Sequence, residues 1–112
     1  MSKFDNVIES CKTQMKKIGT RADNELLEKI AKSLGPSIYN RDASLVATSQ
    51  KTEMDNIRKK FIGKKLGVTD DKVADKAIEK AIDKIGRSNR HKLRVVFYYL
   101  LVKNLKKESV CK

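Results

Sequence analysis

The sequence predicts an all-α protein: a compact five-helix bundle, one domain over residues 1–112, with a central and largely apolar C-terminal helix. Three observations favour this fold class. Apolar residues recur at steps of three and four along most of the chain, which is the periodicity of helices with one buried face. Only one proline and five glycines interrupt the 112 residues. Hydrophobic residues make up 39% and charged residues 36%, which suits a core beneath a strongly ionic surface.

The first two helices are predicted from their apolar stripes and their end signals. The first carries its stripe between residues 4 and 18 and ends at Gly19, because glycine readily adopts the left-handed backbone that closes a helix. Asp23 is the expected N-cap of the second helix, since its carboxylate can accept a hydrogen bond from a free backbone N–H. Gly35-Pro36 ends that helix, because proline cannot continue the helical hydrogen bonding.

The segment before the third helix has the weakest pattern. Asp42 is expected to cap one short turn that carries Leu45 and Val46. Tyr39, Arg41 and Asp42 could together form a recognition surface on an ordered loop. The favoured interpretation is structural: Asp42 caps the turn, and Tyr39 packs its ring beneath the helices.

A third helix is expected from about residue 48 to a stop at Gly67, and a fourth over residues 69–86. Val68 and Val73 would form a hydrophobic staple at the start of the fourth helix, which we expect to open at Thr69.

Residues 71–86 consist of four tetrads, DKVA, DKAI, EKAI and DKIG. Four residues turn a helix by about 400°, so the carboxylates and the lysines form two slowly winding rows with ion pairs between them. Ala74, Ala77 and Ala81 would allow a partner helix to approach closely. The repeat therefore predicts a charged solvent face above a packed face, and it suggests no catalytic role.

The fifth helix is expected to run from Asn89 to about Lys107, with Ser88 as its N-cap. Residues 95–102 are apolar on all sides, which predicts a helix surrounded by its neighbours. Because this run is also rich in β-branched and aromatic residues, a strand is the alternative. A lone strand would lack a pairing partner in an otherwise helical chain, so we favour the helix.

Positive charge concentrates in the second half of the chain. The formal net charge is +12; residues 1–56 hold nine basic and eight acidic side chains, and residues 57–112 hold seventeen and six. If the helices fold up and down, residues 58–65 share one end of the bundle with Lys103, Lys106 and Lys107, and the basic residues of 84–94 lie at the other end. Such clusters could contact the phosphates of nucleic acid. The candidate anion-binding or nucleic-acid-binding residues are Arg58, Lys59, Lys64, Lys65, Arg87, Ser88, Arg90, Lys92, Arg94 and Lys106.

The segment GRSNRHK at residues 86–92 is the more local candidate for an anion site. The free N–H groups of a helix starting here would meet the Ser88 hydroxyl and the cations of Arg87, Arg90 and Lys92. The alternative is structural: Ser88 is an ordinary cap, and the arginines pair with nearby carboxylates.

Enzymatic chemistry is not expected. His91 is the only histidine, and it stands between Arg90 and Lys92 without an evident carboxylate or cysteine partner. The carboxylates of residues 71–86 alternate with lysines, which argues against a metal cluster. No Gly-rich phosphate loop, nucleophile elbow or HExxH pattern occurs. We therefore expect no catalytic residue, no metal and no cofactor.

The expected partner is nucleic acid or another polyanion, bound without sequence readout. Zinc-finger, RNP and bZIP patterns are absent from the sequence, and a fifth helix this apolar is ill suited to lie in a DNA groove. The alternative is a protein–protein adaptor or homo-oligomer that uses exposed apolar surface around the tyrosines.

No membrane association is expected, and the cytoplasm is the expected compartment. The longest apolar run, residues 95–102, is far shorter than the roughly 20 residues of a membrane span. Cys11 and Cys111 are too far apart in sequence to form a zinc knuckle or a redox pair, and Cys11 lies on an apolar helix face. Reduced thiols, with Cys11 as a small core residue, are the simplest interpretation.

A resemblance to a known family rests on three stretches: LGPSIYNRDAS at 34–44, IRKKFIGKKLGV at 57–68 and SNRHKLRVVFYYLLVKNLKKESV at 88–110. With the SKFDNVIE start they resemble a family of short bacterial proteins classified only as a domain of unknown function. The similarity covers nearly the whole chain, and its last stretch is the most specific. The resemblance implies a small, cytoplasmic, all-helical bacterial protein, and it implies no catalytic or binding residue.

Overall fold

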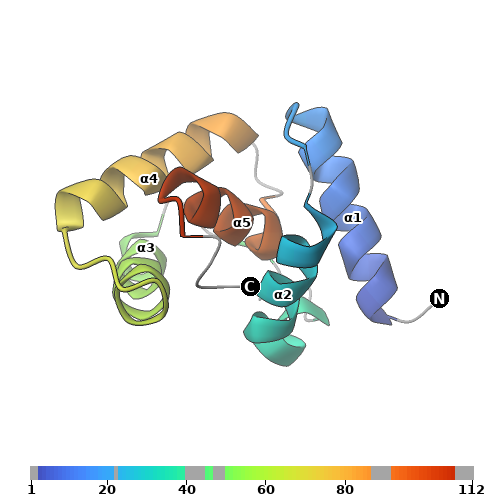
Figure 1. Ribbon diagram of the computed structural model, residues 1–112, viewed down its shortest axis with the longest axis horizontal. Coiled ribbons are helices and arrows are strands. Elements are labelled where there is room, and N and C mark those ends of the chain that lie inside the picture. The colour runs from blue at the N-terminus through green and yellow to red at the C-terminus, as the bar shows by residue number, and fades with distance from the viewer. Residues whose placement is uncertain (1–2, 22, 40–44, 47–49, 87–91, 108–112) are drawn as a thin grey trace.

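The predicted sequence of helices is confirmed by a computed structural model, which describes residues 3–21, 23–39, 45–46, 50–86 and 92–107 (Figure 1). Over these residues the backbone is helical apart from turns and one isolated β-bridge. The α-helices are α1 (Lys3–Lys17), α2 (Asn24–Leu34), α3 (Lys51–Asn56), α4 (Asp71–Ile85) and α5 (Arg94–Asn104). A 3₁₀-helix, η1 (Gly35–Tyr39), follows α2, and a π-helix, η2 (Ile57–Lys65), continues α3 without a break.

Helix α5 occupies the centre of the fold, as predicted. It packs against α1, α2 and α4, and Figure 1 shows it between α4 on one side and the α1–α2 pair on the other. All side chains of residues 95–102 are buried. The Tyr98 ring also contacts the Phe61 ring of η2, with 4.2 Å between centroids. Because neighbours cover α5 on every side, the helix needs the apolar residues that it carries all round.

The ends of α1 and α2 lie where their local signals predict. Gly19 and Gly35 have positive φ angles of 73° and 68°, which glycine adopts without steric cost. Asp23 caps α2, and its Oδ1 accepts a hydrogen bond from the Leu26 N–H at 3.3 Å.

A buried tyrosine fixes the turn between α1 and α2 to the centre of the protein. The Tyr99 hydroxyl accepts a hydrogen bond from the Asp23 N–H at 3.0 Å and donates one to the Arg21 carbonyl at 3.2 Å. Both bonds span more than seventy residues of sequence, so they connect the first half of the chain to α5.

Helix α4 begins at Asp71, and its N-cap lies one residue later than expected. Asp70 is the N-cap and accepts a hydrogen bond from the Lys72 N–H at 2.9 Å, so the helix does not open at Thr69. This shift moves Val73 away from the position that a staple requires, and Val73 is 45% exposed while Val68 packs on the core. The predicted staple is therefore wrong.

The tetrad repeat is divided between solvent and core as predicted. Ala74, Ala77 and Ala81 are buried, and the acidic and lysine rows of α4 are exposed. The small alanines let α5 approach closely enough for the Asn104 side chain to donate a hydrogen bond to the Ala77 carbonyl at 3.1 Å.

Helix α5 begins at Arg94 rather than at Asn89. Leu93 has an extended backbone (φ −65°, ψ 131°) and forms an antiparallel bridge with Leu45, and the Val46 N–H donates to the Lys92 carbonyl at 2.9 Å. The helical turn expected at Leu45 and Val46 is therefore wrong too, because these residues pair with the segment before α5. Asp42, Ser88 and Asn89 lie outside the described residues.

The helix formed by α3 and η2 changes its winding at Ile57. Its start at Lys51 and its end before Gly67 (φ 72°) match the expected helix closely. In the π-helical part the Leu66 N–H reaches back five residues to the Phe61 carbonyl at 3.0 Å. The buried residues of this stretch recur every four to five positions: they are Ile57, Phe61, Ile62 and Leu66. That spacing fits the roughly 4.4 residues per turn of a π-helix better than the α-helical repeat.

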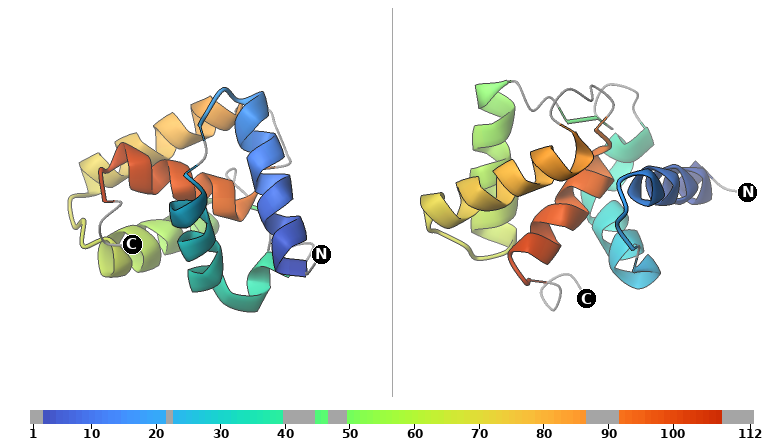
Figure 2. Two further views of the ribbon diagram at one scale, coloured as in Figure 1. Left: turned by 45° about the vertical axis from the view of Figure 1, so that its right-hand side comes forward. Right: turned by 90° about the horizontal axis from the view of Figure 1, so that it is seen from above.

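The helices do not fold up and down. Figure 2 shows that the continuous α3–η2 helix crosses α4 steeply, so the antiparallel arrangement assumed for the basic clusters is wrong. The C-terminal ends of η2 and α5 nevertheless lie side by side in Figures 1 and 2. Tyr39 is 47% exposed rather than packed beneath the helices; Arg41, the third residue of that predicted cluster with Asp42, lies outside the described residues.

Candidate functional site

Arg94, a candidate anion-binding residue, is engaged within the fold. Its guanidinium lies 2.7 Å from the Glu53 carboxylate and donates to the Tyr98 hydroxyl and the Leu45 carbonyl, each at 3.2 Å. Burial alone would lower the pKa of Arg94, but the interactions with Glu53 and Tyr98 together outweigh it, so the pKa is raised and the guanidinium stays charged. Burial raises the pKa of Tyr98, against the opposing effect of Arg94. Arg94 therefore joins α3, α5 and the extended segment at Leu45.

Arg58 and Lys92 also have structural surroundings: Arg58 forms ion pairs, and Lys92 is buried. Arg58 forms ion pairs with Asp55 on its own helix, at 2.9 Å, and with Asp75 on α4. These partners raise the pKa of Arg58 despite the opposing effect of burial. Lys92 is buried, with 3% of its surface exposed.

The lysines of η2, unlike Arg58, Lys92 and Arg94, extend from the surface into solvent. All four of them, Lys59, Lys60, Lys64 and Lys65, are exposed. Residues 57–69 contain five basic side chains and no carboxylate. Lys103 and Lys106 add exposed cations at the end of α5, which lies beside the end of η2 (Figure 2). The ends of η2 and α5 are thus brought together, whereas the Lys103 side chain lines a hollow with Arg21 and Asp23 at the turn between α1 and α2.

Lys106 has an unusual backbone for a lysine. Helix α5 closes with the Lys107 N–H donating to the Val102 carbonyl at 3.0 Å and the Lys106 N–H donating to the Lys103 carbonyl at 3.2 Å. This is the Schellman arrangement, whose left-handed position is usually filled by glycine. Lys106 takes that position with φ 56°. A cation is thus kept at a site where a lysine costs conformational energy.

The predicted second cluster is only partly described. Arg87, Ser88, Arg90 and His91 lie outside the described residues. Helix α5 begins at Arg94, so the free N–H groups at its start are not at Ser88. The prediction that these N–H groups form part of an anion site with Ser88 is therefore wrong. The Leu93 N–H, just before the helix, donates to the Gln14 side chain at 3.2 Å.

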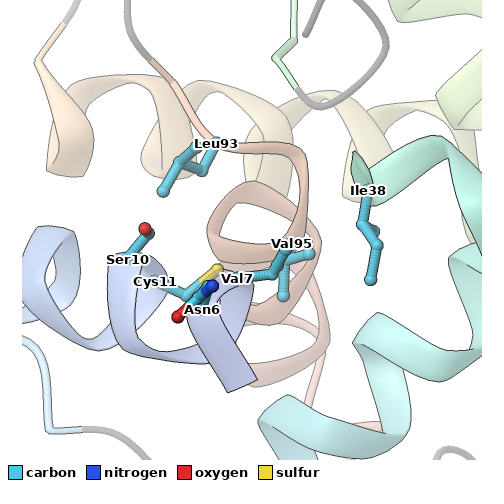
Figure 3. Close-up of a pocket in the computed structure, with 7 residues that line it drawn as sticks. All are labelled: Asn6, Val7, Ser10, Cys11, Ile38, Leu93 and Val95. Atoms are coloured by element: carbon cyan, nitrogen blue, oxygen red, sulfur yellow. The ribbon is translucent and has the colours of Figure 1, made fainter. Parts of the chain in front are cut away.

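A small cavity of about 290 Å³ lies between α1, η1 and the start of α5 (Figure 3). Its walls are mostly apolar, and the side chain of Cys11 lies on the α1 wall beside Ser10. Burial raises the pKa of the Cys11 thiol to about 12, so the thiol stays protonated near neutral pH and is a poor nucleophile. Cys11 is a core residue, as expected.

Two further properties concern the described part of the chain alone. There, no group of three or more histidine, cysteine or acidic side chains is placed to hold a metal ion. Nor does any helix among those residues have the length and apolarity to cross a bilayer.

Sequence reasoning missed two features of this site. The π-helical winding could have been recognised from the spacing of Ile57, Phe61, Ile62 and Leu66, had a period longer than 3.6 been tested. The pairing of Arg94 with Glu53 connects positions forty-one residues apart, and no local pattern indicates it.

These features define a small all-α domain with a buried C-terminal helix and a basic end. Its family is known: residues 9–109 match the model of the family described as "Protein of unknown function (DUF2853)", and the chain belongs to it. This confirms the predicted resemblance to a family of unknown function. No curated protein matches the chain.

Proposed function

We propose that this domain is a non-enzymatic module that binds the phosphate backbone of nucleic acid through its basic end. The proposal rests on one observation: the arginines and the lysines of this region have different surroundings. Arg58 and Arg94 pair with carboxylates of α3 and α4, while the lysines of η2 and the end of α5 face solvent. Uncompensated lysines on one end of a protein attract a polyanion and release its counterions.

The chemistry of these cations favours contact with phosphates rather than bases. Lysine presents a point charge on a flexible stem, which suits phosphate oxygens, whereas bidentate base recognition is typical of arginine. A recognition helix must also enter a groove, and α5 is buried. We therefore propose binding without sequence readout.

A salt titration tests the proposal. Fluorescence anisotropy of a labelled 20-base-pair DNA duplex, repeated with an RNA duplex, gives the binding constant at several salt concentrations. If about five phosphates are neutralised, log K falls with log salt at a slope of about −4 to −5. Absence of binding to both duplexes at low salt would contradict the proposal.

The burial of two tyrosines favours nucleic-acid binding over the alternative function, a protein adaptor or homo-oligomer. Tyr98 and Tyr99 are buried, and the large hydrophobic residues exposed in the described part of the chain are Tyr39 and Val73, which lie on different elements. Light scattering and capture from a nuclease-treated bacterial lysate would detect such a role, because a protein partner survives the nuclease.

The proposed compartment is the bacterial cytoplasm. The resemblance to short bacterial proteins supports the origin, and a reduced, buried Cys11 fits a reducing compartment. Nucleic acid is abundant there, so absorbance at the nucleic-acid wavelength in freshly purified protein is an inexpensive first observation.

A further inference from the structure

We propose that the π-helical winding of η2 creates the phosphate-binding face of this domain by gathering Lys59, Lys60, Lys64 and Lys65 on one side of the helix. We call these four residues the lysine face. The inference rests on the proposed function and deepens it, because it assigns binding of the duplex backbone to one helix face.

The gathering follows from the angular step of the helix. With roughly 4.4 residues per turn, each residue of η2 advances by about 82°. Relative to Lys59, the other three lysines then lie at about 80°, 50° and 130°, so one sector of about 130° contains all four. An α-helix advances by about 100° per residue and would spread the same lysines over about 240°. The π-helical winding therefore halves the arc over which the charge is distributed.

The same step places the apolar residues on the other side of η2. Ile57, Phe61, Ile62 and Leu66 fall within a sector of about 80° that does not overlap the lysine face. All four of these side chains are at most 6% exposed. The core therefore holds η2 in a fixed rotation, and that rotation directs the four lysines to solvent.

Three carboxylates of α3 and α4 are paired with arginines. Glu53 pairs with Arg94, and Asp55 and Asp75 both pair with Arg58. Because these three acids are already paired, they offer less compensation to the lysine face. The two arginines thus keep the lysines available for an external anion.

A purely structural role accounts for only part of the face. Lysines in the last turn of a helix interact favourably with the negative end of its dipole, which suits Lys64 and Lys65. Lys59 and Lys60 lie more than a turn earlier, where this effect has faded. Their place in the same sector as the later pair is explained by a ligand that contacts both turns.

Two variants with equal charge changes test the inference by anisotropy with the same DNA duplex. The variant K59Q/K60Q/K64Q/K65Q removes the lysine face, and the control K72Q/K76Q/K80Q/K84Q removes four exposed lysines that alternate with acids on α4. At about 0.9 per contact, we expect the first variant to reduce the salt slope by about 3 to 4 and the control by less than 1. Circular dichroism establishes that both variants remain helical.

The possible outcomes separate the two proposals. Equal losses in the two variants, or an unchanged slope in the first, would overturn the lysine face, and duplex binding by the wild-type protein would then depend on other cations. A wild-type protein that binds no duplex at low salt would overturn both. A selective loss in the first variant supports both.

The winding itself has an independent readout. Spin labels on K59C/K64C, in a C111S background with the buried Cys11 unlabelled, are expected to show dipolar broadening as strong as that of a pair four residues apart. Residues five apart differ by about 50° around a π-helix and by about 140° around an α-helix. The pair K60C/K64C is the positive control, since residues four apart are close in either winding. Broadening clearly weaker in K59C/K64C than in the control pair would overturn the inference.

Discussion

Replacing Lys106 by glycine is expected to stabilise the domain and weaken its binding to nucleic acid at the same time. Lys106 closes α5 with φ 56°, a conformation that glycine adopts without the steric conflict between Cβ and the backbone. The side chain also supplies one exposed cation at the basic end. The two effects of the substitution therefore act on different properties.

The gain in stability can be worked out from the backbone. A left-handed conformation costs an L-residue roughly 1–2 kcal/mol. Glycine also makes the unfolded chain more flexible, which reduces the gain in stability by about 0.4–1 kcal/mol. The expected net gain is about 0.5–1 kcal/mol, which raises the melting temperature of a domain of this size by roughly 2–6 °C.

Urea denaturation measures the gain, and Lys107→Gly is the matched control. It removes the same charge one residue later, where φ is not positive, so it is not expected to stabilise the protein. The salt slope for duplex binding should become shallower by about 0.9 in Lys106→Gly if its ammonium contacts one phosphate. A Lys106→Gly variant no more stable than Lys107→Gly would refute the strain on which this reasoning depends.

Three further predictions concern the fold. Tyr99→Phe removes the hydrogen bonds to Asp23 and Arg21 and should cost about 2–3 kcal/mol in urea denaturation, and a loss below about 0.5 kcal/mol would show that these bonds contribute little. Because burial raises the pKa of the Cys11 thiol from 9.0 to about 12, its contribution to stability is fully present below pH 9 and is lost as pH rises from about 9 to 12, by an amount on the order of 4 kcal/mol. The pH dependence of unfolding in Cys11→Ala should be flatter over that window, and parallel curves for the two proteins would contradict the raised pKa. Val96→Asp places a carboxylate without a partner in the core and should abolish the cooperative thermal transition, whereas a retained transition would mean that α5 is not central.

Local chemistry made much of this fold predictable. Asp23, Gly19 and Gly35 act through hydrogen bonds and backbone angles within a few residues, so their roles can be inferred from neighbouring sequence alone. The burial of α5 was likewise predictable, because a helix that is apolar on all sides has to be enclosed.

Two of the errors come from contacts between distant segments. Pairing of Leu45 and Val46 with the residues before α5 delays the start of that helix to Arg94, and nothing near Ser88 in the sequence indicates it. The steep crossing of η2 and α4 similarly depends on how their faces pack.

The basic end was predicted only as a concentration of charge. The sequence shows which basic residues the cluster contains. It does not show which of them pair with carboxylates and which face solvent. Arg58 and Arg94 were expected to bind an anion, and both pair with acids on other elements. The number of lysines in η2 follows from the sequence. Their position on one side of the helix depends on the π-helical winding, which an assumed period of 3.6 residues per turn does not predict.

Nuclear magnetic resonance of the lysine side-chain nitrogens during titration with a DNA duplex tests the central claim most directly, because it observes the charged groups themselves. Saturable shifts concentrated at Lys59, Lys60, Lys64 and Lys65, with a smaller one at Lys106, are the predicted result. Shifts of equal size along the lysine row of α4, or no shifts at low salt, would contradict it.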